Sequence, residues 1–355
     1  MTTPTTPPPL RVLRGDADAP IEPLRAALVA ILGYGNQGRA HAANLRDSGI
    51  RVIVGGRARG AGIGAARADG FDAAPFDEAT RAADLVVFAL PDETHADVYR
   101  RHVAEVATHG ATLGFLHGFS MRYGLVTPRA DLGSVLVAPK GPGTTLRERF
   151  ARGQGIPALF GVERESARGD ARALALAWAN GIGCARAGII ETSFAHETET
   201  DLFGEQAVLC GGLAALVVAA YETLVTAGYP PELAYIECCH EVKQVADLVY
   251  ARGLAGMRAA ISNTAEFGSF DAQARIATPA LRAEFERMLA EIRNGAFARR
   301  MIDDHAGGDR WLEAQRAAGK SHPLESVGAH VRTLMPWLAQ EGATPNPTTT
   351  RTEQR

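Results

Sequence analysis

Two pairs of acidic residues are the first sign of chemistry in this chain. Asp201 and Glu205 are four residues apart, and Glu237 and Glu241 repeat that spacing. On a helix, side chains at this spacing project from one face, with their Cβ atoms roughly 6 Å apart. Both pairs adjoin strongly apolar sequence, and carboxylates that face an apolar interior need cations as partners. The spacing therefore predicts metal binding at both pairs.

The ligand type indicates which metal this is. The two pairs offer only oxygen ligands, which favours a hard cation such as Mg²⁺ over zinc. If the pairs converge, they can hold two ions that polarise a substrate's oxygens from two sides. Two alternatives stay open: acid pairs at this spacing are often solvated surface, and Glu237 with His240 forms the Glu-x-x-His element of a di-iron bundle, although the sequence holds no second copy.

The length and composition limit the classes of protein to which the chain can belong. With 355 residues and a net charge of −3, the chain is long enough for about two domains and has no electrostatic case for binding nucleic acid or an anionic membrane. Its four cysteines lack Cys-x-x-Cys spacing, and we see no signal peptide at the N-terminus, so we expect a reduced, cytoplasmic protein. The longest uncharged apolar run, Ala207 to Tyr221, is short for a bilayer and predicts a buried helix.

A glycine-rich turn near the N-terminus predicts a dinucleotide site. A buried strand over residues 26–32 leads into Gly33-Tyr-Gly-Asn-Gln-Gly38 and then into a helical stretch that runs to Asp47. This is the Gly-x-Gly-x-x-Gly fingerprint in its required context. Gly33 allows the tight turn, Gly35 lets the backbone approach a pyrophosphate, and Gly38 lets the helix pack on the strand. The first amides of the helix are donors for that anion.

The end of the second strand bears on the choice of cofactor. Residues 51–54 predict this strand, and Arg57 and Arg59 follow it where folds that prefer NAD usually place an acid. Arginines suit a 2′-phosphate, which favours NADPH over NADH. Solvated loop arginines are the alternative.

Four more apolar runs, at residues 84–90, 111–116, 134–137 and 157–160, complete an α/β doubly wound parallel sheet. Ligands of such sheets lie beyond the carboxyl ends of the strands. His117 and Lys140 fall at two of those ends. His117 then either works in the active site or is a satisfied structural histidine, and we expect Lys140 to meet an anion or a carboxylate.

The alternation of strands and helices stops after Glu191. Helical patterns continue to about Leu338 and include both acid pairs, so the second domain is predicted to be all-α. We expect a dinucleotide-binding domain over 11–191, a helical domain over 192–338, and disordered tails at 1–10 and 339–355. Many apolar helices without a strand partner also suggest burial against another subunit.

Several longer motifs resemble a known family. Taken together they closely resemble ketol-acid reductoisomerase, also called acetohydroxyacid isomeroreductase, in its short bacterial form, from about Arg11 to Leu338. The motifs are Gly33-Tyr-Gly-Asn-Gln-Gly-Arg-Ala-His41, Val137-Ala-Pro-Lys-Gly-Pro-Gly143, Glu197-Thr-Glu-Thr-Asp-Leu-Phe-Gly-Glu-Gln206 and Ser262-Asn-Thr-Ala-Glu266.

The resemblance implies a Rossmann-like domain, a knotted helical domain, and active sites completed between two subunits of a homodimer or larger assembly. Members bind two Mg²⁺ and NADPH, and convert 2-acetolactate or 2-aceto-2-hydroxybutanoate to dihydroxy acids in valine and isoleucine synthesis. By position, the residues that match family sites are metal ligands Asp201, Glu205, Glu237 and Glu241; catalytic His117, Lys140 and Glu241; the substrate residue Ser262; and cofactor contacts Gly33, Tyr34, Gly35, Asn36, Gln37, Gly38, Arg57, Arg59, Asp92, Glu93, Thr94, His95 and Gly143.

The chain also departs from the family pattern. Gly60 and Gly62 stand where members that use NADPH commonly carry serines, so NADH remains possible. Ser120 replaces an asparagine and Thr144 a histidine, both beside the active site. These changes leave open a paralogue that rearranges or reduces a related 2-keto acid. The proton donor or acceptor is also open between Glu241 and a metal-bound water relayed towards Lys140.

Overall fold

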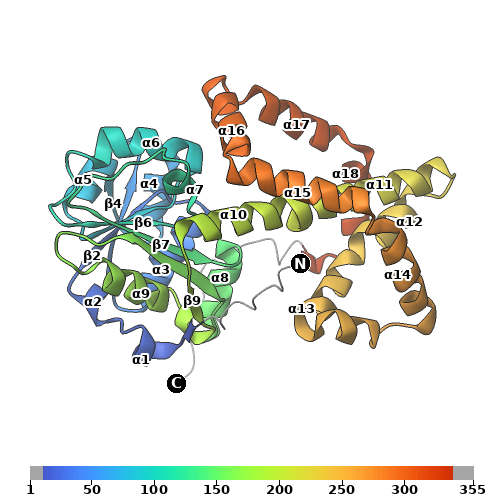
Figure 1. The fold of residues 1–355 in the computed structure, drawn as a ribbon, viewed down its shortest axis with the longest axis horizontal. Coiled ribbons are helices and arrows are strands. Elements are labelled where there is room, and N and C mark those ends of the chain that lie inside the picture. Colours follow the sequence, from blue (N-terminus) through green and yellow to red (C-terminus); the bar gives the residue numbers. More distant parts are fainter. Residues whose placement is uncertain (1–10, 339–355) are drawn as a thin grey trace, which may run out of the picture. The chain divides into compact units, whose positions relative to one another are not determined.

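The structure is a computed structural model, which describes residues 11–338. The chain forms two compact units, one that extends to Thr200 and one that begins at Asp201 (Figure 1). The predicted tails, 1–10 and 339–355, lie outside the described residues.

The N-terminal unit contains a nine-stranded sheet with the order β1-β9-β8-β7-β6-β5-β2-β3-β4. Strand β2 lies in the interior of the sheet, parallel to β3 on one side and to β5 on the other. The strands are β1 (Val12–Leu13), β2 (Leu28–Leu32), β3 (Arg51–Gly56), β4 (Asp72–Pro75), β5 (Leu85–Phe88), β6 (Thr112–Phe115), β7 (Gly133–Pro139), β8 (Ala158–Arg164) and β9 (Ile189–Glu191).

Alternation along each strand divides the core of this unit into two layers. Val29 and Ile31 of β2 belong to one buried cluster, and Ala30 and Leu32 of the same strand belong to the other. Successive side chains of a strand point to opposite faces, so both faces of the sheet carry apolar side chains. Helices cover both of these faces (Figure 1). The helices of this unit are α1 (Gly15–Asp18), α2 (Glu22–Arg25), α3 (Asn36–Asp47), α4 (Ala61–Ala68), α5 (Phe76–Arg81), α6 (His95–Val98), α7 (Phe119–Arg122), α8 (Gly143–Ala151) and α9 (Ala171–Gly181), with short helical turns η1 (Asp92–Thr94), η2 (Tyr99–Val103) and η3 (Cys184–Arg186). Helix α10 (Phe194–Gly204) begins in this unit and continues past its last residue, Thr200.

The predicted doubly wound α/β sheet is confirmed, although two of its strand pairs are antiparallel and the sheet is therefore mixed. Strand β8 runs antiparallel to β7, and β1 runs antiparallel to β9, whereas the other neighbouring strands are parallel. An apolar run indicates that a strand is buried but not its direction. The sequence pattern also missed β4, whose residues Asp-Ala-Ala-Pro have low strand propensity.

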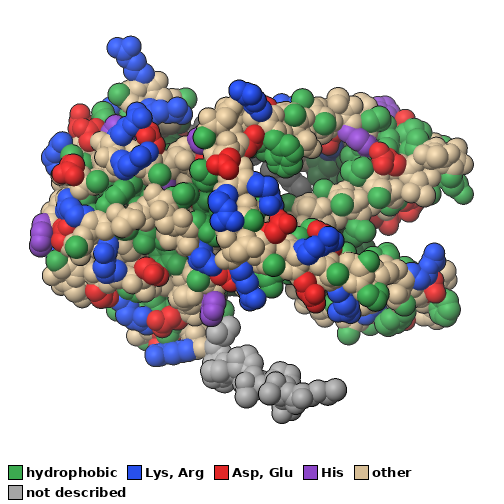
Figure 2. Space-filling model, turned by 45° about the horizontal axis from the view of Figure 1, so that its top comes forward, with side chains coloured by type: hydrophobic (Ala, Val, Ile, Leu, Met, Phe, Trp, Pro, Cys, Tyr) green, Lys and Arg blue, Asp and Glu red, His purple; other side chains and the backbone are tan. Residues whose placement is uncertain are grey.

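All described elements of the C-terminal unit are helical. They are η4 (Glu205–Leu209), α11 (Gly211–Thr226), α12 (Pro231–Tyr235), η5 (Ile236–His240), α13 (Val242–Arg258), α14 (Asn263–Ile276), α15 (Pro279–Arg293), α16 (Ala296–Ala306), α17 (Arg310–Ser321) and α18 (Pro323–Arg332). Its buried core is small and gathers around Tyr221, Tyr235 and Leu324. Many large apolar side chains are exposed instead, among them Tyr250 and Phe267, which are 84% and 78% exposed. Figure 2 shows hydrophobic side chains, in green, at the protein surface.

The prediction that Ala207 to Tyr221 forms a buried helix is wrong for the single chain. This run covers part of η4 and α11, and within α11 only Tyr221 is buried. The helical stretch Phe194–Thr226 is long and apolar enough to cross a membrane by length and composition alone. The apolar sequence correctly predicted a helix, but the described residues, 11–338, leave most of it unburied.

Candidate active site

The glycine-rich turn has the geometry that an approaching anion requires. Gly33 has a φ of +103°, and a Cβ built there would lie 2.4 Å from the carbonyl oxygen of Ala89, so only glycine fits. A Cβ at Gly35 would meet nothing within 4 Å, so the space over the turn is open. Gly35 is the N-cap of α3, and no side chain caps that end of the helix. The amides of the first turn can therefore bind a pyrophosphate.

Side chains of the turn are anchored to neighbouring elements. The Tyr34 hydroxyl donates to the Asp69 carboxylate at 2.7 Å, and burial together with this contact raises the pKa of Tyr34. The Gln37 amide donates to the carbonyl oxygen of Gly141 at 3.0 Å. A Cβ at Gly143 would lie 2.2 Å from the carbonyl oxygen of Asn36, which explains why glycine follows the Lys140 loop.

Arg57 and Arg59 lie where the sequence analysis expected a 2′-phosphate. Both follow β3 and are exposed. Neither side chain forms a hydrogen bond or an ion pair with any other residue in the range 11–338. Gly60 is the N-cap of α4, again without a side-chain cap, so this loop offers two cations and free backbone donors but no hydroxyls at Gly60 and Gly62.

Asp92 and His117 form a close pair at the carboxyl ends of two neighbouring strands. Strands β5 and β6 are adjacent and parallel, and the His117 Nδ1 lies 2.8 Å from the Asp92 Oδ2. Asp92 was predicted to contact the cofactor, whereas its carboxylate is engaged with the predicted catalytic histidine. Glu93 is half-buried in the same turn, and the Thr94 hydroxyl donates to the backbone carbonyl of Pro91.

The side chain of His95 is turned into the protein. It is 2% exposed, its Nδ1 lies 2.7 Å from the Ser120 hydroxyl, and its Nε2 lies 3.0 Å from the carbonyl oxygen of Leu90. Burial lowers the pKa of His95. Both ring nitrogens are occupied, so any contact of this residue with a cofactor would have to come from its backbone.

Lys140 pairs with a buried carboxylate. Its Nζ lies 2.7 Å from the Glu197 Oε1, and the Gly118 amide donates to the Glu197 Oε2 at 3.0 Å. Glu197 is 1% exposed, so its charge depends on these contacts. Glu197 thus links the ammonium group of Lys140 to the backbone amide of Gly118, the residue that follows His117. Together the two acid–base pairs can hold and move protons beside the predicted cofactor turn.

Glu197 was not among the predicted site residues. The signal was present, because Glu197, Asp201 and Glu205 continue the same four-residue spacing along the helix. Asp201 lies one turn after Glu197 on α10, and so projects from the same side of that helix. A row of three acids at this spacing, rather than a pair, is the pattern that would have predicted Glu197.

The four predicted metal ligands lie at two π-helical turns. Asp201 and Glu205 flank the junction of α10 and η4, while Glu237 lies in η5 and Glu241 follows it as the N-cap of α13. Such turns often mark functional sites. Glu205, Glu237 and Glu241 are exposed and Asp201 is half-buried, so within the single chain these acids do not face an apolar interior.

The single chain does not gather these acids into one cage. Among residues 11–338, no group of three possible metal ligands within 4.8 Å includes Glu205, Glu237 or Glu241. An all-carboxylate donor set still fits Mg²⁺. The predicted substrate residue Ser262 caps α14, where its hydroxyl accepts from the Ala265 amide at 3.2 Å.

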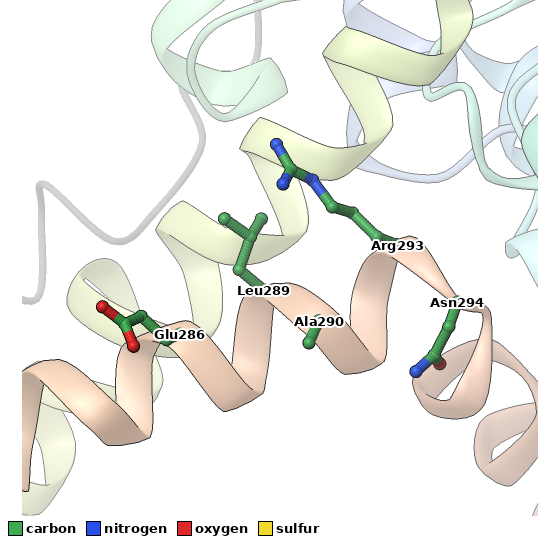
Figure 3. Close-up of a pocket in the computed structure, with 5 residues that line it drawn as sticks. All are labelled: Glu286, Leu289, Ala290, Arg293 and Asn294. Carbon is green, nitrogen blue, oxygen red and sulfur yellow. The ribbon is translucent and has the colours of Figure 1, made fainter. Parts of the chain in front are cut away.

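An open hollow of about 580 Å³ lies along α15. Its lining residues are Glu286, Leu289, Ala290, Arg293 and Asn294. Figure 3 shows that these side chains project from successive turns of the helix without converging on one point. This hollow does not have the convergent polar groups of a catalytic site.

Comparisons with known proteins cover nearly the whole described chain. A family described as the NADPH-binding domain of acetohydroxy acid isomeroreductase matches residues 23–188, and one described as the C-terminal domain of ketol-acid reductoisomerase matches residues 194–337. The solved structure of an NADH-preferring ketol-acid reductoisomerase from an uncultured archaeon is 39% identical, with a TM-score of 0.88 over 92% of this chain and 99% of that chain.

A more distant similarity concerns the fold alone. A semialdehyde dehydrogenase NAD-binding protein from Cupriavidus necator, solved with calcium and NAD, is 17% identical to this chain. The TM-score is 0.56, over 76% of this chain and 99% of that chain.

Proposed function

The chain belongs to the ketol-acid reductoisomerase family and is an NAD(P)-dependent isomeroreductase, and on this premise we propose how it works on its substrate. It takes 2-acetolactate to 2,3-dihydroxy-3-methylbutanoate, and 2-aceto-2-hydroxybutanoate to the ethyl homologue, with the help of two Mg²⁺ ions. The observation that carries this proposal is the pair of acid–base contacts, His117 with Asp92 and Lys140 with Glu197, at the strand ends beside the dinucleotide turn.

The reaction needs an alkyl shift before the reduction. The substrate hydroxyl must lose its proton while the neighbouring carbonyl becomes electron-poor, and bound Mg²⁺ would polarise both oxygens. Asp201, Glu205, Glu237 and Glu241 would hold the ions, because carboxylates are the donors that Mg²⁺ prefers.

The chain's own residues have three tasks around that step. Ser262 would bind the substrate carboxylate, and the dinucleotide turn would hold the cofactor so that its reactive carbon faces the substrate. Lys140 and His117 would hold or move protons at the substrate oxygens. The Glu197 contact supports this role for Lys140, because it fixes an ammonium group at the end of β7.

A second copy of the chain would complete the active site. Glu237 and Glu241 are exposed, and so are apolar residues of the same unit such as Leu209 and Leu216, which are 65% and 58% exposed. Large exposed apolar patches mark interfaces in water-soluble proteins. A homodimer, or an assembly of dimers, would bury this surface and would bring the second acid pair to the first.

The cofactor is a nicotinamide dinucleotide, and we propose NADPH as the preferred form, with NADH also accepted. Arg57 and Arg59 support the preference for a 2′-phosphate. Gly60 and Gly62, which offer no hydroxyls, and the NADH preference of the archaeal relative support the use of NADH. Michaelis constants for the two cofactors with the same substrate would decide the order. The four unpaired cysteines support a cytoplasmic location for the enzyme.

Purified protein with 2-acetolactate, Mg²⁺ and NADPH tests the reaction. We expect cofactor oxidation that stops when the metal is chelated. Turnover of 3-hydroxy-3-methyl-2-oxobutanoate but never of 2-acetolactate would instead indicate a plain 2-keto acid reductase.

Asp201→Asn tests the metal site. Loss of a ligand to the ions should lower turnover of 2-acetolactate roughly 100- to 1,000-fold, while cofactor binding, measured by fluorescence titration, stays unchanged. Asp303→Asn, a change at an exposed acid of α16, is the matched control. Unchanged turnover in Asp201→Asn would remove Asp201 from the metal site.

A further inference from the structure

We propose that Asp92 is a positioning residue for His117: its carboxylate holds the imidazole in one orientation with the proton on Nδ1. This inference rests on the proposed function, in which His117 works at the active site. It differs from the sequence expectation that Asp92 contacts the cofactor.

The geometry of the pair is that of a hydrogen bond. The His117 Nδ1 and the Asp92 Oδ2 are 2.8 Å apart, and the two side chains are 21% and 20% exposed. Both residues follow strand ends that are fixed by the pairing of β5 with β6. A carboxylate can only accept, so the hydrogen of this bond belongs to the His117 Nδ1.

The surroundings of His95 exclude it as a competing partner of Asp92. The carbonyl oxygen of Leu90 can only accept, so the proton of the buried His95 ring lies on Nε2. The His95 Nδ1 then accepts from the Ser120 hydroxyl at 2.7 Å. Its lone pair, 3.7 Å from the Asp92 Oδ1, offers Asp92 no proton.

Ser120 therefore has a part in this arrangement. The hydroxyl keeps His95 in its neutral tautomer, which leaves the carboxylate of Asp92 to His117. Burial, which lowers the pKa of His95, acts in the same direction. In consequence, the histidine that faces the strand ends has a carboxylate partner, and the histidine behind it is a neutral structural group.

The next peptide is fixed from the other side. The Gly118 amide donates to the Glu197 Oε2 at 3.0 Å, and the Lys140 Nζ binds the other oxygen of Glu197 at 2.7 Å. His117 and Gly118 are thus held between two carboxylates, one that orients the ring and one that orients the backbone. A carboxylate behind a working imidazole fixes both its tautomer and its direction.

Kinetics of two variants distinguish positioning from cofactor binding. Asp92→Ala removes the acceptor, and a displaced imidazole should lower kcat about 10- to 100-fold while the Michaelis constant for the cofactor changes less than about 2-fold. Asp92→Asn keeps an amide oxygen that can accept from Nδ1 and should retain more of kcat than Asp92→Ala. Asp97→Asn, at an acid whose side chain is 48% exposed and pairs with Arg101, is the control and should match the unmodified enzyme.

A double variant tests whether Asp92 acts through His117. If it does, adding Asp92→Ala to His117→Ala should lower kcat little further. Any of three results would overturn the proposal. The first is an equal fall in kcat on Asp92→Ala in the two backgrounds, and the second is an equal fall in kcat in Asp92→Ala and Asp92→Asn. The third is a raised Michaelis constant for the cofactor at unchanged kcat.

A spectroscopic measurement remains informative even if 2-acetolactate is not the substrate. In protein labelled with ¹⁵N-histidine, the signals of His117 are identified by their absence in His117→Ala. We expect a proton on Nδ1 in the unmodified chain and in the Asp97→Asn control, and a shift towards the Nε2 tautomer in Asp92→Ala. An unchanged ring signal in Asp92→Ala would overturn the proposal, whereas inactivity of the unmodified enzyme towards 2-acetolactate would overturn only the proposed reaction.

Discussion

The two units of this protein differ in how much of their apolar surface they bury. The sheet unit covers both faces of its sheet, and its buried carboxylate Glu197 has partners within the same unit, Lys140 and the Gly118 amide. The helical unit has a small core around Tyr221 and leaves Leu216 58% exposed. We infer that the sheet unit sets its own site geometry, and we propose that the helical unit takes a second copy of the chain to set its own.

The strongest test of this difference places charge on the exposed helix α11. Leu213→Asp with Leu216→Asp should raise the dissociation constant of the dimer at least about 100-fold, because each change would bury an unpaired charge in the interface. Sedimentation velocity measures the assembly, and cofactor binding to the sheet unit should persist.

The control for this experiment is Val12→Asp, which alters an exposed apolar side chain of the sheet unit. It should leave the assembly intact. If the α11 variant still forms dimers of the same strength, the exposed face of α11 is not the interface, and the comparison of the two units fails.

The next effect concerns the ion pair within the sheet unit. Glu197→Gln keeps an acceptor for the Gly118 amide but removes the charge that faces Lys140. Lys140 is 31% exposed, so solvent offsets part of the loss, and we expect the free energy of unfolding to fall by about 2–3 kcal/mol. Urea denaturation measures this change. Glu199→Gln removes a more exposed carboxylate, which binds Arg122, and should lower the free energy of unfolding by less. Equal decreases in the two variants would contradict the assignment of Glu197 as the buried partner.

The core of the sheet unit should also make stability depend on pH. His41 is fully buried and accepts from the Trp178 indole at 3.0 Å, and burial lowers the pKa of His41 to about 3. The unfolded chain binds this proton near pH 6.5, so the contribution of His41 is fully present above that pH and is lost as the pH falls towards 3. The expected slope is about 1.4 kcal/mol per pH unit.

Other groups titrate in the same range, so the measurement compares the unmodified chain with His41→Asn. The free energy of unfolding of the two proteins, measured between pH 6 and pH 4, should differ in slope by nearly that amount. Parallel slopes would mean that His41 is protonated in the folded protein, in conflict with its burial.

The smallest effect concerns the anchor of the dinucleotide turn. Tyr34→Phe removes the hydroxyl that donates to Asp69 and should lower the free energy of unfolding by about 1 kcal/mol, with a modest rise in the Michaelis constant for the cofactor. Tyr229→Phe, at a side chain that is 53% exposed in the helical unit, should change neither quantity. An equal effect of the two changes would mean that the turn does not depend on this contact.

Most helices and strands of the sheet unit could be predicted from local sequence. Apolar runs gave the interior strands, and the spacing of Gly33, Gly35 and Gly38 gave the turn, because only glycine tolerates the backbone conformation and close approach found there. The direction of β8 was not readable, since both directions bury the same side chains. The edge strand β4 was missed because its residues carry little strand preference.

The sequence by itself determined the chemistry available to this protein: a dinucleotide turn, acids at helical spacing, and a histidine and a lysine at strand ends. Only the tertiary structure decided which of these groups meet. It joined Asp92 to His117 and Glu197 to Lys140, residues that lie 25 and 57 positions apart. Residue type and local spacing fix what a side chain can do, whereas contacts across such distances depend on how strands are ordered and helices packed, and local sequence does not encode that order.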